Sequence, residues 1–257
     1  MLALNNIFVT FNKGTVDENR LFEDFSFTIK TGEFVSVIGS NGSGKTTMLN
    51  LICGTLLPDG GKILLDDKDI TRVREYKRNE IIGRVFQDPK MGTCPDLTIL
   101  ENMALADNKN KRYGITPAIS DRRVGYYQTL LQQCNMGLEN RMGVKVGALS
   151  GGQRQALALI IATMSDIDLL VLDEHTAALD PHTAELIMEL TDRIVKEKQL
   201  TAVMVTHNLR YAVEYGSHLI MMDKGKIVVD KSGEEKQNIH TEDLLKVFNE
   251  ISIECGN

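Results

Sequence analysis

The 257-residue sequence has few cysteines and lacks any apolar segment long enough to cross a bilayer. Its four cysteines lie far apart, with no Cys-x-x-Cys pair among Cys53, Cys94, Cys134 and Cys255. A disulfide framework or a cysteine zinc site would need tighter clustering, so reduced thiols in a cytoplasmic protein are expected. The longest apolar run, Ala156–Met164, is less than half of the roughly 20 residues that a membrane helix needs.

The chain also lacks an excess of basic residues, because 29 Lys and Arg stand against 35 Asp and Glu, for a net charge of −6. This balance argues against a surface specialised for nucleic acid. The first residues do not join a basic stretch to an apolar core, so no secretion signal is expected. With 42% hydrophobic and 25% charged residues, the composition indicates a globular protein of one large domain or two closely packed ones.

Three short apolar runs predict strands that are buried on both faces. They show little alternation of polar and apolar residues, as in a parallel sheet covered by helices: Phe34–Ile38, Leu169–Leu172 and Ala202–Val205. Polar residues or glycines follow each run, at the strand end where an α/β sheet binds its ligands. A helix is expected over Pro181–Lys198, with Asp180 as its N-cap. One of its faces should carry an apolar stripe formed by Leu186, Ile187, Leu190, Ile194 and Val195.

Other regions predict a different local structure. Residues 2–30 and 219–229, each interrupted by turn-forming residues, are expected to form antiparallel strands. Residues from about 90 to 148 lack a strong strand pattern and are expected to form an inserted helical subdomain. The tail, residues 234–257, is expected to be helical around Thr241–Ile251. The predicted fold class is α/β, with a mixed, largely parallel sheet and an N-terminal antiparallel β subdomain.

A phosphate-binding loop follows the first buried strand. The motif GxxxxGK[ST] is matched by Gly39-Ser40-Asn41-Gly42-Ser43-Gly44-Lys45-Thr46. Its glycines allow successive backbone N–H groups to surround phosphate oxygens, and the helix that continues through Thr47 points its positive end at the anion. Lys45 is expected to reach the terminal phosphates, and the Thr46 hydroxyl to ligate Mg²⁺. The sequence therefore predicts nucleotide binding.

Chemically active side chains follow the other two buried strands. Asp173 is expected to hold Mg²⁺ through water, and Glu174 to polarise an attacking water as general base. His207 is expected to contact a γ-phosphate, the alternative being a structural histidine.

A second glycine motif, Ser150-Gly151-Gly152-Gln153, precedes a long helical run. Ser150 can cap this helix, and the glycines expose N–H donors at its positive end, which makes a second anion site. The motifs LSGGQ, GxxxxGKT, LLVLDE and ALD, with the strand-end histidine, stand in the order seen in the ATP-binding cassette ATPases of ABC transporters. The chain resembles this family over residues 1–233, and the resemblance implies a P-loop NTPase core.

The resemblance implies a head-to-tail dimer of two such ATPase subunits, in which each ATP lies between the phosphate loop of one copy and Ser150–Gln153 of the other. It implies that Gln87 contacts Mg²⁺ and the attacking water. Asp180, in Ala178-Leu179-Asp180, belongs to the loop that joins the two sites. Phe11 stands where the family stacks an aromatic ring on adenine, the alternative being a core phenylalanine.

The sequence departs from the family pattern at two positions. His175 replaces the usual proline after the general base, and Ala177 replaces a serine whose hydroxyl crosses the dimer interface. Neither departure removes a ligand or the base, so an active ATPase is expected.

For the physiological role, the resemblance implies a separate subunit that docks on membrane permease subunits at the cytoplasmic face of the membrane. His175, the segment from Gln87 to Thr93 and the tail resemble a bacterial group with a substrate-binding lipoprotein and permeases of the branched-chain amino-acid type. Import of amino acids, aromatic ones among them, is therefore expected. Two alternatives remain open: the ATPase of an exporter, and a soluble non-transport ABC ATPase acting on nucleic acid or ribosomes, which the acidic charge disfavours.

Overall fold

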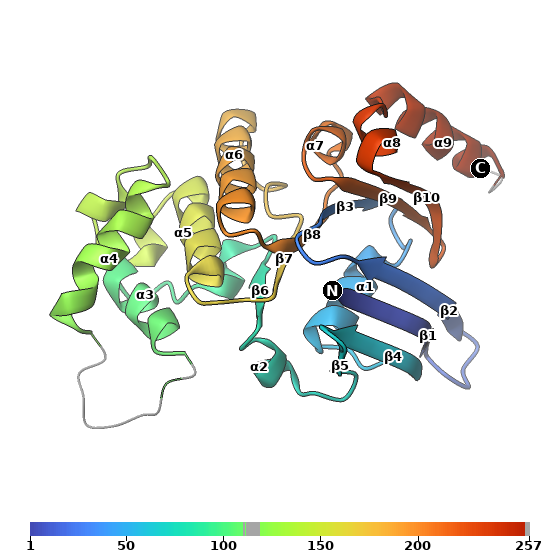
Figure 1. Cartoon of the computed structure of the whole chain (residues 1–257), viewed down its shortest axis with the longest axis horizontal. Coiled ribbons are helices and arrows are strands. Elements are labelled where there is room, and N and C mark those ends of the chain that lie inside the picture. Colours follow the sequence, from blue (N-terminus) through green and yellow to red (C-terminus); the bar gives the residue numbers. More distant parts are fainter. Residues whose placement is uncertain (110, 112–118, 255–257) are drawn as a thin grey trace. The chain divides into compact units, whose positions relative to one another are not determined.

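The computed structural model describes residues 1–109, 111 and 119–254, with side chains up to residue 250, and divides the chain into two compact units. Unit 1 comprises Met1–Asn79 and Gln199–Asn257, and unit 2 comprises Glu80–Lys198 (Figure 1). Among the described residues, no helix combines the length and the hydropathy that a membrane crossing requires.

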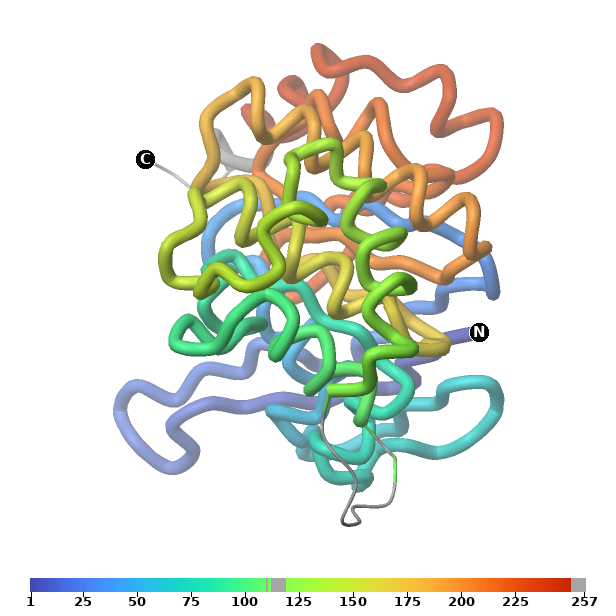
Figure 2. Tube along the Cα trace, turned by 90° about the vertical axis from the view of Figure 1, so that its left-hand side faces the viewer, coloured from blue at the N-terminus to red at the C-terminus, as the bar shows by residue number. Residues whose placement is uncertain are grey.

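Unit 1 contains an antiparallel sheet with the strand order β2-β1-β4-β5. Its strands are β1 (Leu2–Phe11), β2 (Asn19–Ile29), β4 (Gly60–Leu65) and β5 (Lys68–Asp69). This confirms the antiparallel pairing predicted for residues 2–30, in which Leu2 lies opposite Ile29. The loop between β1 and β2 projects from the sheet (Figure 2), and its Val16 side chain is fully exposed.

Unit 1 also contains a mainly parallel set of strands centred on β3 (Phe34–Gly39), all of whose residues are buried. β3 pairs in parallel with β8 (Thr201–Val205) and with β9 (His218–Asp223). β10 (Lys226–Ser232) returns antiparallel to β9, as the hairpin pattern predicted. The mostly apolar runs therefore mark strands covered on both faces.

Helix α1 (Lys45–Cys53) follows β3, and its carboxyl end is held by a fully buried arginine. Arg78, the last residue of the short helix α2 (Glu75–Arg78), donates to the carbonyl oxygens of Leu51 at 2.6 Å and Ile52 at 2.9 Å. The same guanidinium also donates to the carbonyls of Thr71 and Val73. A cation at the negative end of a helix is favourable, and here it satisfies carbonyls that lack intrahelical partners.

The carboxyl-terminal part of unit 1 also contains the helices α7 (Leu209–Glu214), α8 (Gly233–Gln237) and α9 (Thr241–Glu254). Leu244 of α9 is fully buried in a cluster with Ile38, Ala212, Leu219 and Met221. The Lys236 ammonium of α8 is buried and donates to the carbonyls of Val213 and Tyr215. The helix predicted around Thr241–Ile251 is therefore present, and its Leu244 packs against Ile38 of β3.

Unit 2 contains the parallel pair β6 (Ile82–Val85) and β7 (Leu169–Asp173) with the helices α5 (Gly151–Thr163) and α6 (Pro181–Glu197). Asp180 caps α6 as predicted, accepting from the Thr183 N–H at 3.0 Å. Of the apolar stripe expected on this helix, Leu186 is 38% exposed, while Ile187, Leu190, Ile194 and Val195 are buried.

The segment from residue 90 to 148 is helical where it is described. It contains α3 (Ile99–Asp107), α4 (Asp121–Gln132) and the single-turn 3₁₀ helices η1 (Pro89–Gly92), η2 (Leu138–Asn140) and η3 (Val146–Ala148). Asp107 ties α3 to α4, because its carboxylate accepts two hydrogen bonds from Arg123 and one from Tyr127.

Candidate functional site

The loop between β3 and α1 has a backbone that glycine makes possible. The φ angles of Gly42 and Gly44 are +79° and +105°, in the left-handed region that other residues rarely adopt. A Cβ on Gly44 would lie 2.9 Å from the Phe22 ring, and one on Gly39 would lie 2.2 Å from the Met222 carbonyl oxygen. Both the turn and the close approach of neighbouring groups therefore require the predicted glycines.

Hydrogen bonds within unit 1 hold this loop in place. The buried Lys45 ammonium donates to the carbonyls of Gly39 at 2.8 Å and Ser40 at 2.9 Å. The Ser40 hydroxyl donates to Asp223 at 3.0 Å, and the Gly225 N–H donates to the Ser43 carbonyl at 3.0 Å. The loop is thus preorganised around the ammonium group.

The loop fits a phosphate group. The N-cap of α1 is Gly44, which has no side chain to satisfy the first N–H groups of the helix, those of Thr46 and Thr47 included. The Ser43 hydroxyl is buried without a hydrogen-bond partner among the described residues. Donors left in this way at a positive helix end suit an anionic ligand.

The residues predicted to hold Mg²⁺ are a threonine, a glutamine and an aspartate. Among the described residues, no three His, Cys, Asp or Glu side chains are arranged to bind a metal ion. Mg²⁺ in nucleotide sites is held by one or two protein ligands, phosphate oxygens and water, which matches the predicted donors Thr46, Gln87 and Asp173. Thr46 belongs to unit 1, whereas Gln87 and Asp173 belong to unit 2.

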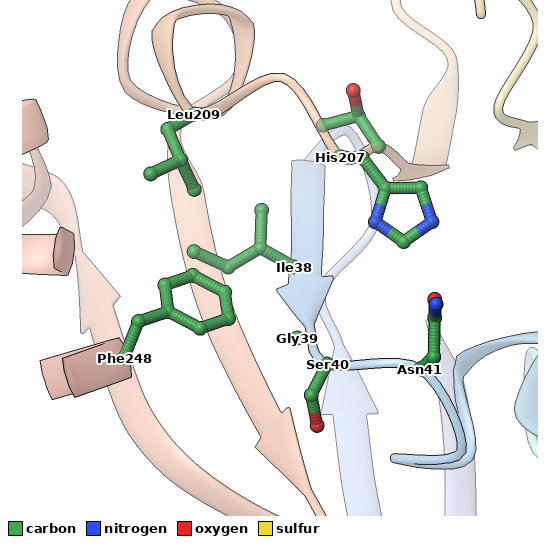
Figure 3. A pocket seen from close by; sticks show the side chains of 8 residues that line it. Ile38, Gly39, Ser40, Asn41, His207, Leu209 and Phe248 are labelled. Atoms are coloured by element: carbon green, nitrogen blue, oxygen red, sulfur yellow. The ribbon is translucent and has the colours of Figure 1, made fainter. Parts of the chain in front are cut away.

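The predicted histidine lies beside the phosphate loop. His207 is exposed and follows β8, where the Thr206 N–H donates to the Val37 carbonyl of β3. Figure 3 shows the cavity of about 350 Å³ at this place, with the His207 ring near Asn41. The cavity is lined by Ile38, Gly39, Ser40, Asn41, Thr206, His207, Leu209 and Phe248. Unit 1 therefore brings the loop and the strand-end histidine together.

In unit 2, Asp173 ends β7 and forms an ion pair with a neighbouring strand. Arg84 of β6 donates to Asp173 Oδ2 at 2.8 Å, and both side chains are largely buried. The Arg84 guanidinium also lies 4.7 Å from the centre of the Phe86 ring. A carboxylate offers about four lone-pair sites, so this bond leaves room for a water-mediated metal contact.

Glu174 follows with a backbone φ of +47°, which is unusual for a residue other than glycine. The next side chain, His175, is only 2% exposed, and its Nε2 lies 3.1 Å from the Thr191 hydroxyl of α6. Burial lowers the pKa of His175 to about 4, so the ring is neutral at pH 7. The sequence identified His175 as a departure from the family, but it gave no sign of the bond to Thr191.

Gln87 is exposed and follows β6 between two anchored residues. The preceding carbonyl, that of Phe86, accepts from Gln155 of α5 at 3.2 Å. The following residue, Asp88, caps η1 by accepting from the Lys90 N–H at 3.0 Å. The predicted glutamine is thus presented on a loop whose flanks are fixed within unit 2.

The LSGGQ motif starts α5, and here the side chains cap one another. The Ser150 hydroxyl accepts from the Gln153 N–H, and the Gln153 side chain accepts from the Ser150 N–H, both at 3.2 Å. A Cβ on Gly152 would lie 2.2 Å from the Thr183 methyl group of α6, whereas one on Gly151 would have 3.7 Å to its nearest neighbour, Leu179. Gly152 therefore serves packing, and Gly151 lies exposed at the start of the helix.

The last two predicted contact residues, Asp180 and Phe11, belong to different units. Asp180 is exposed, and hydrogen bonds from Thr183 keep the pKa of its carboxyl group below the usual value. Phe11 ends β1 with 37% of its surface exposed, so it is not the buried core phenylalanine that the sequence left as an alternative. Unit 1 thus carries the phosphate loop, His207 and Phe11, while unit 2 carries the other predicted residues.

Comparisons with known proteins identify the family of the chain. The family model described as ABC transporter matches residues 22–177. The tyrosine transport ATP-binding protein of Clostridioides difficile (strain R20291) is 46% identical over 248 residues, which cover 96% of this chain and 98% of that protein.

Solved structures of ATP-binding cassettes have the same fold. MJ0796, a dimer in a post-hydrolysis state bound to ADP and Pi, gives a TM-score of 0.77 at 30% identity, over 90% of this chain and 98% of that one. The ADP conformation of MJ1267, a cassette of an ABC transporter, gives a TM-score of 0.79 at 26% identity, over 100% of this chain and 99% of that one. The chain therefore belongs to the ABC transporter family, as an ATP-binding subunit that hydrolyses ATP.

Proposed function

We propose that this subunit powers a bacterial importer of amino acids, with aromatic amino acids such as tyrosine as its substrates. The observation that carries the proposal is the 46% identity, along nearly the whole of both chains, to a protein named for tyrosine transport. The direction of transport is inferred from the resemblance of the Gln87–Thr93 segment and the tail to an importer group.

For the hydrolytic site, we assign the phosphates of ATP to the loop Gly39–Thr46 with Thr47, and the adenine to Phe11. Mg²⁺ would be held by Thr46, Gln87 and Asp173, and would neutralise charge on the phosphates. Glu174 acts as general base towards water, and His207 contacts the γ-phosphate. The preorganised Lys45 and the unsatisfied Ser43 hydroxyl support the first of these assignments.

The partners follow from the second glycine motif. We assign Ser150–Gln153 and Asp180 to the nucleotide bound by a second copy of the subunit, so that two copies enclose two ATP molecules. The dimer would dock on permease subunits at the cytoplasmic face of the membrane, as a peripheral protein. An extracytoplasmic substrate-binding protein would complete the importer.

The base is tested by Glu174→Gln, which removes the negative charge and keeps the shape. Hydrolysis should fall by on the order of a hundredfold or more, because general base catalysis is typically worth 10²–10⁴. ATP binding should persist, and ATP should shift the purified variant from monomer to dimer in light scattering. Hydrolysis at the wild-type rate would refute the assignment.

The transport role is tested in vesicles that contain the subunit with its permease and binding protein. We expect inward transport of labelled tyrosine that depends on ATP and is lost in Glu174→Gln. Phenylalanine and tryptophan should compete better than leucine or glutamate if the substrates are aromatic. Outward transport alone, or transport with no preference for an amino acid, would contradict the proposal.

A further inference from the structure

His175 lies one residue beyond the proposed general base and is tied to a helix. Its ring is 2% exposed, and Nε2 lies 3.1 Å from Oγ1 of Thr191, which is itself fully buried in α6. The bond spans 16 residues of sequence and joins the loop after β7 to the helix that packs behind it. Buried polar groups of this kind are costly unless they are paired, so the contact is a fixed part of the fold.

The direction of this hydrogen bond follows from the bonds around Thr191. The Thr191 hydroxyl donates its hydrogen to the Ile187 carbonyl at 2.7 Å, one helical turn earlier. A hydroxyl has one hydrogen, so towards His175 its oxygen can act only as an acceptor. Nε2 of His175 must therefore carry the proton and donate. Two hydrogen bonds, from His175 to Thr191 and from Thr191 to Ile187, therefore fix the orientation of the ring.

Glu174 is held by constraints on both sides. On one side Asp173 is bonded to Arg84 of β6 at 2.8 Å, and on the other side His175 is bonded to α6. The Glu174 carbonyl also accepts from the Ala177 N–H at 2.9 Å, which closes the turn. Between these anchors the backbone of Glu174 adopts a φ of +47°. Such a conformation persists at a non-glycine residue when the surroundings determine it.

We propose that His175 is a positioning residue for Glu174, acting through its hydrogen bond to Thr191. The bond holds the peptide after Glu174 against α6 and so keeps the carboxylate at the place from which it polarises water. This inference rests on the role of Glu174 as general base in the proposed function. It adds a specific support for the base, because bonds to Arg84 and Thr191 fix the two residues that flank Glu174 in the sequence.

The test compares variants that remove the bond with variants that keep it. Thr191→Val and His175→Ala should each lower kcat roughly tenfold and leave KM for ATP within about twofold, as expected for losing one net hydrogen bond that acts on the base. The two changes together should cost no more than either alone, because both break the same bond. Thr191→Ser, which keeps the hydroxyl, and His175→Gln, whose amide can donate from a similar position, should restore most of kcat.

Thr163→Val is the matched control. Thr163 is 2% exposed in α5, and its hydroxyl donates one turn back to the Leu159 carbonyl, as Thr191 does to Ile187. Among the residues that the structure describes, Thr163 has no bond to those around Glu174, so kcat should stay at the wild-type value. Thermal unfolding and nucleotide binding of every variant show that it is folded.

The outcomes separate this inference from the role of the base. If Glu174→Gln hydrolyses slowly while Thr191→Val and His175→Ala keep the wild-type kcat, the positioning role is wrong and the base assignment stands. If Thr191→Val lowers the melting temperature or raises KM without lowering kcat, the bond is structural and the inference is overturned. If Glu174→Gln itself hydrolyses normally, both assignments fail.

Discussion

Helices α1 and α5 both begin at a glycine-rich motif, yet their first turns are satisfied in different ways. α1 begins after Gly44, which offers no capping side chain, and next to the unsatisfied hydroxyl of Ser43. α5 begins with Ser150 and Gln153 in a reciprocal capping box. The start of α1 therefore depends on a ligand to complete its hydrogen bonding, whereas α5 supplies part of that bonding from its own side chains.

This difference suits the division of labour in the proposed dimer. The loop before α1 has the stronger set of free donors and a buried ammonium, so it is suited to bind nucleotide in a single subunit. The start of α5 retains fewer donors, mainly the N–H groups of Gly151 and Gly152, and so would contribute to a nucleotide that is already bound elsewhere.

The carboxyl ends of α1 and α5 differ as well. The carboxyl end of α1 is bound by the fully buried Arg78. That of α5 is bound by the exposed residue Lys198, which donates to the Thr163 carbonyl.

The largest effect is expected at Lys45. Lys45→Met keeps the length of the side chain and removes the ammonium, which both stabilises phosphate charge and bridges the carbonyls of Gly39 and Ser40. Hydrolysis should fall by on the order of a thousandfold, as when a main electrostatic donor of an active site is lost. The measurement is steady-state phosphate release, with fluorescent nucleotide binding beside it. A variant that binds and hydrolyses ATP normally would remove the basis for assigning the stronger site to α1.

The next largest effect is expected at the residues that bind the carboxyl ends of α1 and α5. Arg78→Met should lower the free energy of unfolding by about 3 kcal/mol, because the buried carbonyls of Leu51 and Ile52 and the partly buried ones of Thr71 and Val73 lose their donor. Lys198→Met should cost less than about 1 kcal/mol, because the Lys198 side chain lies at the surface and water can take over its single hydrogen bond. Urea denaturation measures both. Equal losses would show that the two helix ends are anchored alike.

The third prediction compares matched glycines at the two starts. Gly44→Ala places a methyl group 2.9 Å from Phe22 at a φ of +105°, so ATP affinity of the isolated subunit should fall roughly tenfold or more. Gly151→Ala has 3.7 Å to Leu179 and should leave that affinity within about twofold. Hydrolysis by the dimer should fall in both variants. Calorimetric titration with ATP decides the first point, and a loss of monomer affinity in Gly151→Ala would contradict the contrast.

Much of the fold could be predicted because burial leaves a simple mark on sequence. Runs such as Phe34–Ile38 have no polar residue facing solvent, so they predict strands covered on both sides, and the structure confirms them. Asp180 followed by Pro181 marks a helix start by local chemistry, which is independent of tertiary contacts. The glycines of the phosphate loop are likewise recognisable, because Gly42 and Gly44 adopt backbone angles that other residues rarely do.

The contacts that escaped prediction join residues that are distant in sequence. Arg78 and Lys236 would be expected on the surface from their charge, yet both are buried against main-chain carbonyls, which carry no residue-specific pattern. The same holds for the bond from His175 to Thr191 and for the ion pair between Arg84 and Asp173. Leu186 was expected on the buried stripe of α6 together with Ile187, Leu190, Ile194 and Val195, but it is 38% exposed, because the buried stripe is narrower than the periodicity suggested.

The carbonyl oxygen of Tyr215 joins two parts of unit 1. It accepts from the Ser36 hydroxyl on β3 at 3.1 Å and from the Lys236 ammonium on α8 at 3.0 Å. Ser36 is three residues before Gly39 in β3, and Ile38 of the same strand packs against Leu244 of α9. The carboxyl-terminal helices are therefore tied to the strand that leads into the predicted phosphate loop, so displacing α8 or α9 would also disturb that strand.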